Sequence, residues 1–372
     1  MIPRRSFIVL ALCQTVLVRA GQLSFEELDR LLLSRNVEKK ELYMVSLVSH
    51  IKNIEANKID IVFALPPLCN SSKSRCVGTY FPFNPSIMKT DQGYDVICRT
   101  GCYKLPSYRP LVWVSYRNKN FFLKYDKDFN LLYEQEIPVI SEEIGKNIDR
   151  ATQLEDVRLF NFNNITWTVG VANIRRGPYL PKIALCRLKG SSENSPVSFQ
   201  SLTIFNGPLA DKWEKNWMPI VEGSKLKFIY LYDPFILLEA NIENGTCKEL
   251  LNYTPFLDFS RFRGSAAPIE FDNGYLMMVH EVFRGLIKRR SRYVQRDYIH
   301  RLVYLDKDFN ITKISLPFKF EGISIEFCTS MTIDHLGKNL VMGVGISDSQ
   351  AKLFIADLEY IKTLLRDIST YK

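Results

Sequence analysis

Five short polar clusters recur along the chain, and each precedes a sequence that is typical of a tight hairpin turn. The clusters are Asn84, Glu155-Asp156-Val157-Arg158, Glu214-Lys215-Asn216-Trp217, Arg263-Gly264 and Glu326. The turns are expected near Gln92, Asn163, Glu222, Asn273 and His335. Six to nine residues separate each cluster from its turn, which is about the length of one β-strand. In a repeated fold, equivalent strand ends would bring the five clusters to one place.

The clusters combine carboxylates with cations, and this combination suits the cleavage of glycosidic bonds. Cleavage needs a carboxylic acid that protonates the leaving oxygen and a second group that activates or supplies a nucleophile. Asp156 and Glu155 are the candidate acids, and Glu326 is a further candidate catalytic carboxylate. A phosphate nucleophile would also need basic side chains to hold it. The candidate contacts to phosphate or to substrate hydroxyls are Asn84, Arg99, Arg158, Glu214, Lys215, Asn216, Arg263, His280 and His300.

Each cluster also has an ordinary structural explanation. Glu155 and Arg158 are spaced as a surface ion pair, which contributes little stability. Glu326 lies between two apolar residues, so strand alternation alone would account for it. Trp217 and Tyr103 are candidates for stacking on a sugar ring, although aromatic residues belong more often to a core. The regular recurrence of the clusters, rather than any single cluster, favours a shared site.

An internal repeat identifies the elements that would position these side chains. Asp91-Gln92-Gly93-Tyr94 is followed by Asp126-Lys127-Asp128-Phe129-Asn130, and about 180 residues later the pair recurs as Asp272-Asn273-Gly274-Tyr275 and Asp306-Lys307-Asp308-Phe309-Asn310. Such Asx-X-Gly sequences favour hairpin turns, because Gly adopts positive φ and the Asx side chain bonds its own backbone. Each copy therefore predicts a four-stranded antiparallel sheet, the unit that forms one blade of a β-propeller.

The five turns predict an all-β fold, a five-bladed β-propeller that occupies residues 76–372. Leu358–Ile368 has the spacing of a short closing helix. Residues 21–75 are expected to form a short N-terminal helical segment, opened by a capping-box pair of Ser24 and Glu27. Helical character is expected to resume over Glu38–Ile54, and Ile59–Leu65 has the pattern of a strand. The boundary near residue 75 follows a Pro-Pro pair and a Ser/Lys-rich run.

Residues 1–20 have the pattern of a secretory signal peptide or a short uncleaved anchor, with a short buried N-terminal segment as the alternative. This pattern predicts a location in the secretory pathway or outside the cell, where cysteines can be oxidised. Cys69 with Cys76 and Cys98 with Cys102 are candidate disulfides, and buried thiols are the alternative. Sequons that fit a glycoprotein occur at Asn70, Asn164, Asn244, Asn252 and Asn310.

The charge pattern limits the expected partners. The net charge of +9 is too diffuse to predict nucleic-acid binding. Basic residues concentrate in Arg284–Arg296, which predicts contact with a phosphate, a polyanion or a membrane surface, with a solvated insertion as the alternative. The sequence contains no recognised metal, Walker or dinucleotide motif. We expect a glycan or oligosaccharide partner and no cofactor, with inorganic phosphate as a co-substrate, and the sequence indicates no oligomeric state.

A spaced set of short motifs resembles one known family. The motifs are Asn84-Pro85-Ser86-Ile87, Glu155-Asp156-Val157-Arg158, Lys215-Asn216, Arg263-Gly264, Pro268-Ile269, Gly274-Tyr275 and Val279-His280. They resemble glycoside hydrolase family 130, the five-bladed propellers of β-mannoside phosphorylases and related hydrolases, over about residues 79–360. The chain looks most like a branch that is often attached to glycosyltransferase modules, whose further motifs match residues 214–217, 263–265, 280–282, 298–301 and 322–327.

The resemblance implies roles for individual residues. Asp156 matches the proton donor of the family's phosphorylases, and Arg158 matches the Arg of the same motif. Val157 replaces the motif's Pro and departs from the family pattern. The implied activity is cleavage or transfer of β-linked glycosides, with mannosides expected, by phosphorolysis or hydrolysis with Asp156 as general acid. The alternatives are a non-catalytic glycan-binding or accessory propeller in glycan synthesis, and a glycosyltransferase that uses a sugar-phosphate donor.

Overall fold

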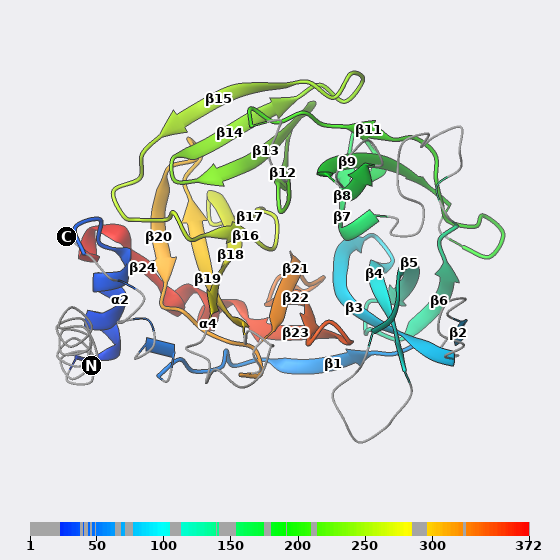
Figure 1. The fold of residues 1–372 in the computed structure, drawn as a ribbon, viewed down its shortest axis with the longest axis horizontal. Helices are drawn as coiled ribbons and strands as arrows, with labels where there is room; N and C mark the ends of the chain where they lie inside the picture. The colour runs from blue at the N-terminus through cyan, green and yellow to red at the C-terminus, as the bar shows by residue number, and fades with distance from the viewer. Residues whose placement is uncertain are drawn as a thin grey trace, which may run out of the picture.

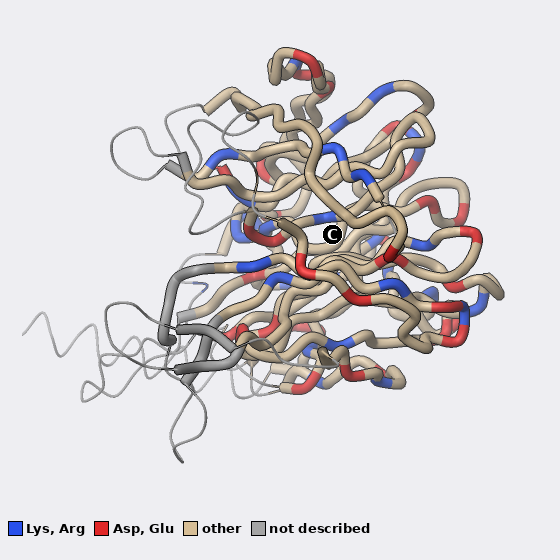
Figure 2. Tube along the Cα trace, turned by 90° about the vertical axis from the view of Figure 1, so that its right-hand side faces the viewer, with Lys and Arg blue, Asp and Glu red and all other residues tan. Residues whose placement is uncertain are grey.

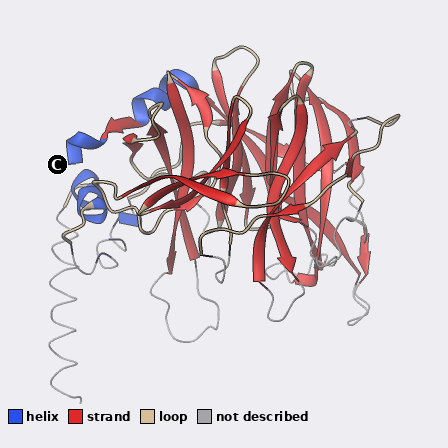
Figure 3. Ribbon diagram, turned by 90° about the horizontal axis from the view of Figure 1, so that it is seen from above, coloured by secondary structure: helices blue, strands red, loops and turns tan. Residues whose placement is uncertain are grey.

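Five antiparallel sheets surround a common axis, which confirms the expected five-bladed β-propeller (Figure 1). The computed structural model describes residues 23–37, 40, 44, 47–48, 50–63, 68–70, 77–104, 113–138, 140, 154–174, 180–190, 192–209, 214–284, 296–322 and 325–371. Seen from above, the strands run between the two faces of the ring, and the helices gather on one side of it (Figure 3).

The blades follow one another in chain order. Blade 1 contains β2 (Leu68–Asn70), β3 (Val77–Thr90), β4 (Gly93–Lys104), β5 (Trp113–Asp126) and β6 (Leu131–Glu136). Blade 2 contains β7 (Leu154–Phe162), β8 (Ile165–Ile174), β9 (Leu180–Lys189), β10 (Ser198–Phe199) and β11 (Thr203–Ile204). Blade 3 contains β12 (Met218–Glu222), β13 (Lys225–Tyr232), β14 (Phe235–Ala240) and β15 (Cys247–Tyr253).

The last two blades include strands from the chain ends. Blade 4 contains β16 (Arg263–Gly264), β17 (Ile269–Phe271), β18 (Gly274–Arg284), β19 (Arg296–Leu305), β20 (Ile311–Ser315) and β24 (Leu365–Asp367). Blade 5 contains β21 (Glu326–Ile333), β22 (Asn339–Ile346), β23 (Gln350–Asp357) and β1 (Asn57–Ile61). Residues of β3, β7, β12, β17 and β21 line a central channel of about 350 Å³.

All five expected hairpin turns join two consecutive antiparallel strands of a blade, and together they form one face of the ring, called here the hairpin face. The second turn of the repeat is also the same in both copies. Oδ1 of Asp126 accepts the amides of Asp128 and Asn130 at 2.9 and 2.8 Å, and Oδ1 of Asp306 makes the equivalent pair at the same distances. Local turn chemistry therefore fixes the same turn in blades 1 and 4.

The N-terminal segment closes the ring. β1 pairs in register with β23, from Asn57 opposite Ile355 to Ile61 opposite Ala351. The boundary expected near residue 75 thus passes between β1 and the rest of the sheet that contains it. Helix α2 (Phe25–Leu33) begins at the expected capping box, in which the Ser24 hydroxyl accepts the amide of Glu27 at 3.2 Å. The expected helix over Glu38–Ile54 falls largely outside the described residues.

The closing helix is present as α4 (Leu358–Leu364), followed by β24 and the 3₁₀ turn η1 (Ile368–Tyr371). β24 pairs with β20, so the C-terminal end of the chain extends blade 4. Among the described helices, none is long and apolar enough to span a membrane. Figure 2 shows Lys and Arg interspersed with Asp and Glu along the described chain.

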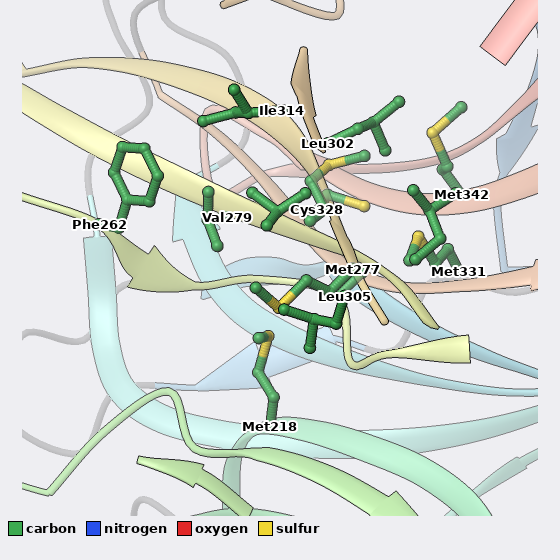
Figure 4. Packing of buried hydrophobic residues seen from close by; sticks show 14 of the residues in the cluster. Met218, Phe262, Met277, Val279, Leu302, Leu305, Ile314, Cys328, Met331 and Met342 are labelled. Atoms are coloured by element: carbon green, nitrogen blue, oxygen red, sulfur yellow. The ribbon is translucent and has the colours of Figure 1, made fainter. Parts of the chain in front are cut away.

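The largest hydrophobic cluster joins blades 3, 4 and 5, and it contains many flexible thioether side chains (Figure 4). Met218, Met277, Met331 and Met342 are buried among aliphatic and aromatic neighbours. Methionine adapts to irregular gaps, and such gaps arise where twisted sheets meet at an angle. Truncating one of these side chains to Ala would cost about 2–5 kcal/mol of folding free energy.

The cysteine prediction is only partly testable. Cys98 is a buried free thiol, so its expected disulfide with Cys102 is wrong. Both residues belong to β4, and four residues of extended strand separate their Cα atoms by about 13 Å, far beyond disulfide reach. The pair of Cys69 and Cys76 lies outside the described residues, because residue 76 is not among them.

Candidate active site

Three of the five sequence clusters place a non-glycine residue in the left-handed region of φ/ψ space. Asn84, Asp156 and Asn216 have φ values of 48°, 50° and 61°. The pairing of the inner strand with its neighbour shifts register at the first two, between Phe83 and Ser86 and between Glu155 and Arg158. Asn and Asp tolerate this conformation best, and such strain is typical of functional sites. The same local distortion therefore marks the beginning of the channel in blades 1, 2 and 3, called here the mouth.

Close glycine contacts hold two of these residues in place. A Cβ atom added at Gly345 would lie 1.9 Å from Oδ1 of Asn84, and one added at Gly264 would lie 2.2 Å from the carbonyl oxygen of Asn216. Both distances are shorter than any tolerable contact with a Cβ atom. Blades 4 and 5 thus contribute glycines where blades 1 and 3 contribute the strained polar residues. Blades 1, 2 and 3 thus supply polar residues to the mouth, and blades 4 and 5 supply glycines that pack against two of them.

Asp156 is the centre of the polar network at the mouth. Its Oδ1 atom accepts hydrogen bonds from Nδ2 of Asn84 at 2.8 Å and from Nη1 of Arg99 at 3.0 Å. Within the described residues its Oδ2 atom accepts none, and the side chain is 17% exposed. Burial alone would raise the pKa of Asp156, but Arg99, Asn84 and Arg158 together lower it. The carboxyl group is therefore ionised at neutral pH and keeps one oxygen available to a ligand.

Glu155 connects three blades on the other side of Arg99. Its carboxylate lies 3.4 Å from Nη2 of Arg99 and 3.7 Å from Nζ of Lys215, and it accepts a hydrogen bond from Nδ2 of Asn173 at 3.2 Å. Burial disfavours the charge of Arg99, but Asp156 and Glu155 raise its pKa on balance. Lys215 remains 40% exposed. The mouth thus carries a firmly charged Arg between two carboxylates and an accessible ammonium group beside them.

Arg158 lies beneath this network and lines the channel. Its Nε donates to the carbonyl of Ser265 at 3.0 Å, and its Nη1 donates to the carbonyl of Asp156 at 3.1 Å. The guanidinium is also 5.9 Å from the ring of Phe327. Its Nη2 atom has no hydrogen-bond partner among the described residues, and neither does the hydroxyl of Tyr232. Arg158 therefore ties blade 2 to blade 4 and adds positive charge under Asp156.

The two histidines are neutral and lie behind the mouth. Nδ1 of His280 is hydrogen-bonded to the hydroxyl of Ser265 at 2.8 Å, and burial together with Arg158 lowers the pKa of His280 to about 3. His300 faces His280 from the next strand and is fully buried, and burial lowers its pKa well below the usual range. Both imidazoles are neutral, so neither supplies a cation for a phosphate.

Two of the expected carboxylates are used by the fold itself. Glu326 is 0% exposed, and its oxygens accept the backbone amides of Phe320 and Glu321 at 2.8 and 2.7 Å. Glu214 is 3% exposed, accepts Nε1 of Trp217 at 3.0 Å and the hydroxyl of Tyr230 at 3.2 Å, and has a pKa raised by burial. Both carboxylates are thus buried and engaged by the fold.

The remaining residues that the sequence suggested lie in different environments. Trp217 is 1% exposed and packs against Phe205 and Phe228, so the expectation that it stacks on a sugar is wrong. The side chain of Tyr103 lies outside the described residues. Arg263 is exposed, and its Nη1 donates to the carbonyls of Ser260 and Phe262 at 3.0 and 2.7 Å. The run Arg284–Arg296 joins β18 to β19 as expected, but residues 285–295 lie outside the described residues.

The structure therefore brings together six predicted residues, called here the mouth cluster. They are Asn84, Arg99, Glu155, Asp156, Arg158 and Lys215. Sequence reasoning missed Asn173, Ser265 and Phe327, which hold Glu155 and Arg158. Of these three residues, Ser265 was the easiest to predict from the sequence, because it directly follows the Arg263-Gly264 motif. Within the described ranges, no three His, Cys, Asp or Glu side chains are grouped to hold a metal ion.

No protein-family model matches the chain, and no curated protein matches it either. Solved structures do share its fold. One comes from work on mannoside phosphorylases and β-1,2-mannoside hydrolases of family GH130, with 11% identity, a TM-score of 0.56, and coverage of 83% of this chain and 97% of that one. A glycosyl hydrolase from Bacteroides ovatus matches with 11% identity, a TM-score of 0.53, and 83% and 95% coverage.

A mannose phosphorylase from Leishmania mexicana, solved in complex with a phosphate ion, matches with 11% identity and a TM-score of 0.51. The match covers 87% of this chain and 94% of the phosphorylase. At such low identity these similarities establish the architecture and leave the chemistry to the residues at the mouth. The resemblance to the propellers of family 130 that the motifs indicated is confirmed at the level of the fold.

Proposed function

We propose that the chain acts on β-linked glycosides, with mannosides as the first substrates to test, at the mouth of its central channel. The observation that carries the proposal is the geometry of Asp156, whose carboxylate is held through one oxygen by Asn84 and Arg99 and keeps the other available. The three structures that share the fold are named for glycosides or mannose phosphorolysis, which supports a carbohydrate substrate. A polar, cation-lined mouth on a rigid scaffold is suited to such a ligand.

Phosphorolysis fits the mouth better than hydrolysis does. Direct hydrolysis needs a second carboxylate to activate water or to act as nucleophile. Glu326 and Glu214 are occupied by the fold, and Glu155 is already engaged by Arg99, Lys215 and Asn173. An external anion is instead matched by the cations of the mouth, namely Lys215 and Arg99, with Arg158 beneath them. Inorganic phosphate is therefore the proposed nucleophile.

The ionised state of Asp156 sets the order of proton transfers. Dihydrogen phosphate enters beside Arg99 and Lys215, and its negative charge offsets the effect of Arg99 on Asp156, so a proton passes from phosphate to the carboxylate. Asp156 then protonates the leaving glycosidic oxygen as the C–O bond breaks, and a phosphate oxygen forms the new bond to the anomeric carbon. The products are a sugar 1-phosphate and a shortened glycan, and Asp156 is again ionised. Run in reverse, the same steps transfer a sugar from a sugar 1-phosphate.

A product assay tests the reaction. β-1,2-Mannobiose and β-mannan oligosaccharides are incubated with and without inorganic phosphate, and mannose 1-phosphate plus each oligosaccharide acceptor is tested in parallel. Sugar 1-phosphate that forms only with phosphate supports the proposal. Free mannose in both conditions would replace it with hydrolysis. Absence of product in all arms, in a sample that binds the oligosaccharides, would leave a non-catalytic glycan-binding propeller.

We also propose a route through the secretory pathway. Asn164, Asn244, Asn252 and Asn310 are all exposed on the described surface, so each sequon is open to glycosylation. Residues 1–20 lie outside the described residues. Expression of the full chain in eukaryotic cells, followed by amidase digestion and N-terminal sequencing, tests both features. An unglycosylated protein that retains residues 1–20 in the cytosol would overturn the proposal.

A further inference from the structure

A second polar cleft lies between blades 1 and 2, on the hairpin face and therefore at the opposite strand ends from the mouth. Its volume is about 450 Å³, within the range of small-molecule sites. Most of the side chains around it are polar. Those that matter here are Thr90, Asp91, Gln92, Asp95, Lys124 and Ser195.

Asp95 is the unusual residue of this cleft. It is 7% exposed, and its Oδ1 atom has no hydrogen-bond partner among the described residues. The hydroxyl of Thr90, which also lines the cleft, is buried and unpartnered in the same way. Lys124 is the direct neighbour of Asp95 on β5, yet the two charges form no ion pair in the described part of the chain. An unpaired buried carboxylate is costly, and native proteins rarely keep one without a reason.

The equivalent positions in the other four blades show which residue types occupy the place of Asp95. Counted from the first residue pair beyond each hairpin turn, the position of Asp95 corresponds to Trp167, Lys227, Leu276 and Met342 in blades 2 to 5. Two of these, Leu276 and Met342, are apolar side chains of a hydrophobic cluster, and Trp167 packs against another cluster with its Nε1 atom unpartnered among the described residues. The fourth, Lys227, is paired with Glu222. Among these equivalent positions, only the one in blade 1 therefore holds a buried charge without a partner, although an apolar residue fits the fold.

The mixture of charges limits what can bind there. Asp95 and Asp91 repel an anion, and Lys124 repels an ammonium or guanidinium group. A neutral ligand with several hydroxyl groups meets both conditions, because each hydroxyl donates to a carboxylate and accepts from an ammonium or a side-chain hydroxyl. We propose that this cleft is a second carbohydrate-binding site, which holds one neutral sugar ring through adjacent hydroxyls on Asp95, Thr90 and Lys124.

The site holds a sugar without taking part in the reaction at the mouth. A sugar in the cleft and a sugar at Asp156 occupy opposite ends of the inner strands, so they do not compete. The cleft would retain the protein on a glycan while the mouth acts on a chain end. The proposal does not depend on the reaction being phosphorolysis, because binding in the cleft and turnover at the mouth are measured separately.

Met88 lies directly opposite Asp95 in the sheet, on a strand that lines the central channel, and it provides a readout next to Asp95. Met88 pairs directly with Asp95 across β3 and β4, whereas Met218 lies against Gly264 near the mouth. Protein labelled with ¹³C at the methionine methyl groups is titrated with D-mannose, D-glucose and D-galactose. We expect a saturable shift of the Met88 signal with at least one hexose, in the wild type and equally in Asp156→Asn.

Two variants of one residue make the test decisive. Asp95→Leu, which copies Leu276 of blade 4, should abolish the Met88 response, raise the melting temperature and leave turnover unchanged. Asp95→Asn, which keeps an acceptor, should retain a weakened response, by about tenfold in affinity. Asp128→Asn, on the exposed turn of the same blade, is the control and should behave as the wild type.

Three outcomes would overturn the proposal. In the first, Met88 responds to none of the hexoses. In the second, the response survives unchanged in Asp95→Leu. In the third, Met88 responds instead to sodium acetate or ammonium chloride, which would mean that the cleft binds small ions. A failure of the product assay leaves the Met88 titration readable, so the two proposals fail separately.

Discussion

In the described part of the chain, two clusters each place one Arg between two carboxylates, and one of the two is at the mouth. In the mouth cluster, Arg99 is bound by Glu155 and Asp156, and the three side chains are 14–17% exposed. In the second, called here the sealed cluster, Arg301 is bound by Asp29 of α2 and Glu281 of β18, and the three side chains are 0–1% exposed. The ionic chemistry is the same, but the environments differ.

The sealed cluster is complete. Nε of Arg301 donates to Glu281 at 2.9 Å, its Nη1 donates to Asp29 at 3.1 Å and to the carbonyl of Ser315 at 3.2 Å, and its Nη2 also donates to Asp29. The hydroxyl of Tyr371 adds a hydrogen bond to Asp29 at 3.1 Å. These contacts fasten both ends of the chain to blade 4. By contrast, the mouth cluster leaves an oxygen of Asp156 without a partner among the described residues, on a strained backbone.

This difference separates structural from functional charge. A buried ion pair that satisfies all of its hydrogen bonds has nothing left to offer a ligand, and removing one partner mainly damages the fold. A partly exposed pair with spare acceptor capacity, held on a strained backbone, is arranged for an incoming group. The two clusters therefore predict opposite responses to mutation, and the following experiments test that contrast.

The largest effect is expected on turnover, in Asp156→Asn. The amide keeps an oxygen for Asn84 and Arg99 but can neither take up nor deliver the proton, so we expect turnover to fall by about 10²–10⁴-fold. The melting temperature should fall only modestly, because Arg99 keeps Glu155 as a partner. Steady-state kinetics with the β-mannosides and a thermal melt provide both numbers. Full activity in the variant would remove Asp156 from the reaction and, with it, the functional side of the contrast.

The opposite pattern is expected for Arg301→Met. Loss of the guanidinium leaves Asp29 and Glu281 buried without their common cation, which should cost about 3–5 kcal/mol of folding free energy. Folded molecules should keep turnover near the wild-type value, since the cluster touches no substrate. Urea denaturation and kinetics on the folded fraction measure the two effects. A stable variant with reduced turnover would show that the sealed cluster supports the mouth directly.

The pH dependence of stability should have opposite signs at Asp156 and Asp95. Burial raises the pKa of Asp95 to about 6, above its usual 3.8, so its contribution to stability is lost as pH rises from about 4 to 6. The cations around Asp156 lower its pKa on balance, so its contribution is instead lost as pH falls below about 4. The Asp95 effect is at most about 3 kcal/mol.

Two amide variants measure this difference in sign. Compared with the wild type, Asp95→Asn should gain relative stability between pH 4 and 6 and then level off, whereas Asp156→Asn should lose relative stability as pH rises toward about 4. Urea midpoints collected across this range provide the comparison. Parallel curves for the two variants would contradict the assignment of one carboxylate as cation-bound and the other as unpaired.

The parts of the fold that are set locally could be predicted from the sequence. The hairpins at Gln92 and Asn273 follow from turn chemistry within four residues, and the capping box at Ser24 is equally local. The closure of blade 5 could not be predicted, because the pairing of β1 with β23 joins residues almost 300 positions apart and has no local pattern. Ile59–Leu65 has the pattern of a strand, and the structure has the strand at Asn57–Ile61, but nothing in the pattern indicates its partner.

The site could be predicted only in part, because the contacts of its side chains also depend on residues that are distant in the sequence. The spacing of the clusters located Asp156 and Asn84 at one mouth, since equivalent strand ends converge in a propeller. The spacing could not show that the carboxylate of Glu326 accepts hydrogen bonds from two backbone amides. Those amides belong to a loop that precedes the strand, and the sequence does not indicate where this loop lies. The sequence also does not indicate that Arg301 is the centre of an ionic cluster, because its partner Asp29 is 272 residues away. The pattern of polar residues thus predicts where the site lies. Tertiary contacts decide which of its side chains are available to a ligand.

The smallest expected effect concerns how α2 is fastened, and Ser24→Ala tests it. The variant removes one hydrogen bond of the capping box, which should cost about 1 kcal/mol of helix stability. Because Asp29 lies on the same helix, the loss should reach the sealed cluster, and amide hydrogen exchange should rise in both α2 and the region of Ser315. The mouth should be unaffected, so turnover and the exchange of amides near Asp156 should not change. Faster exchange at the mouth as well would mean that the two arginine clusters are coupled through blade 4, and that the separation between structural and functional charge is incomplete.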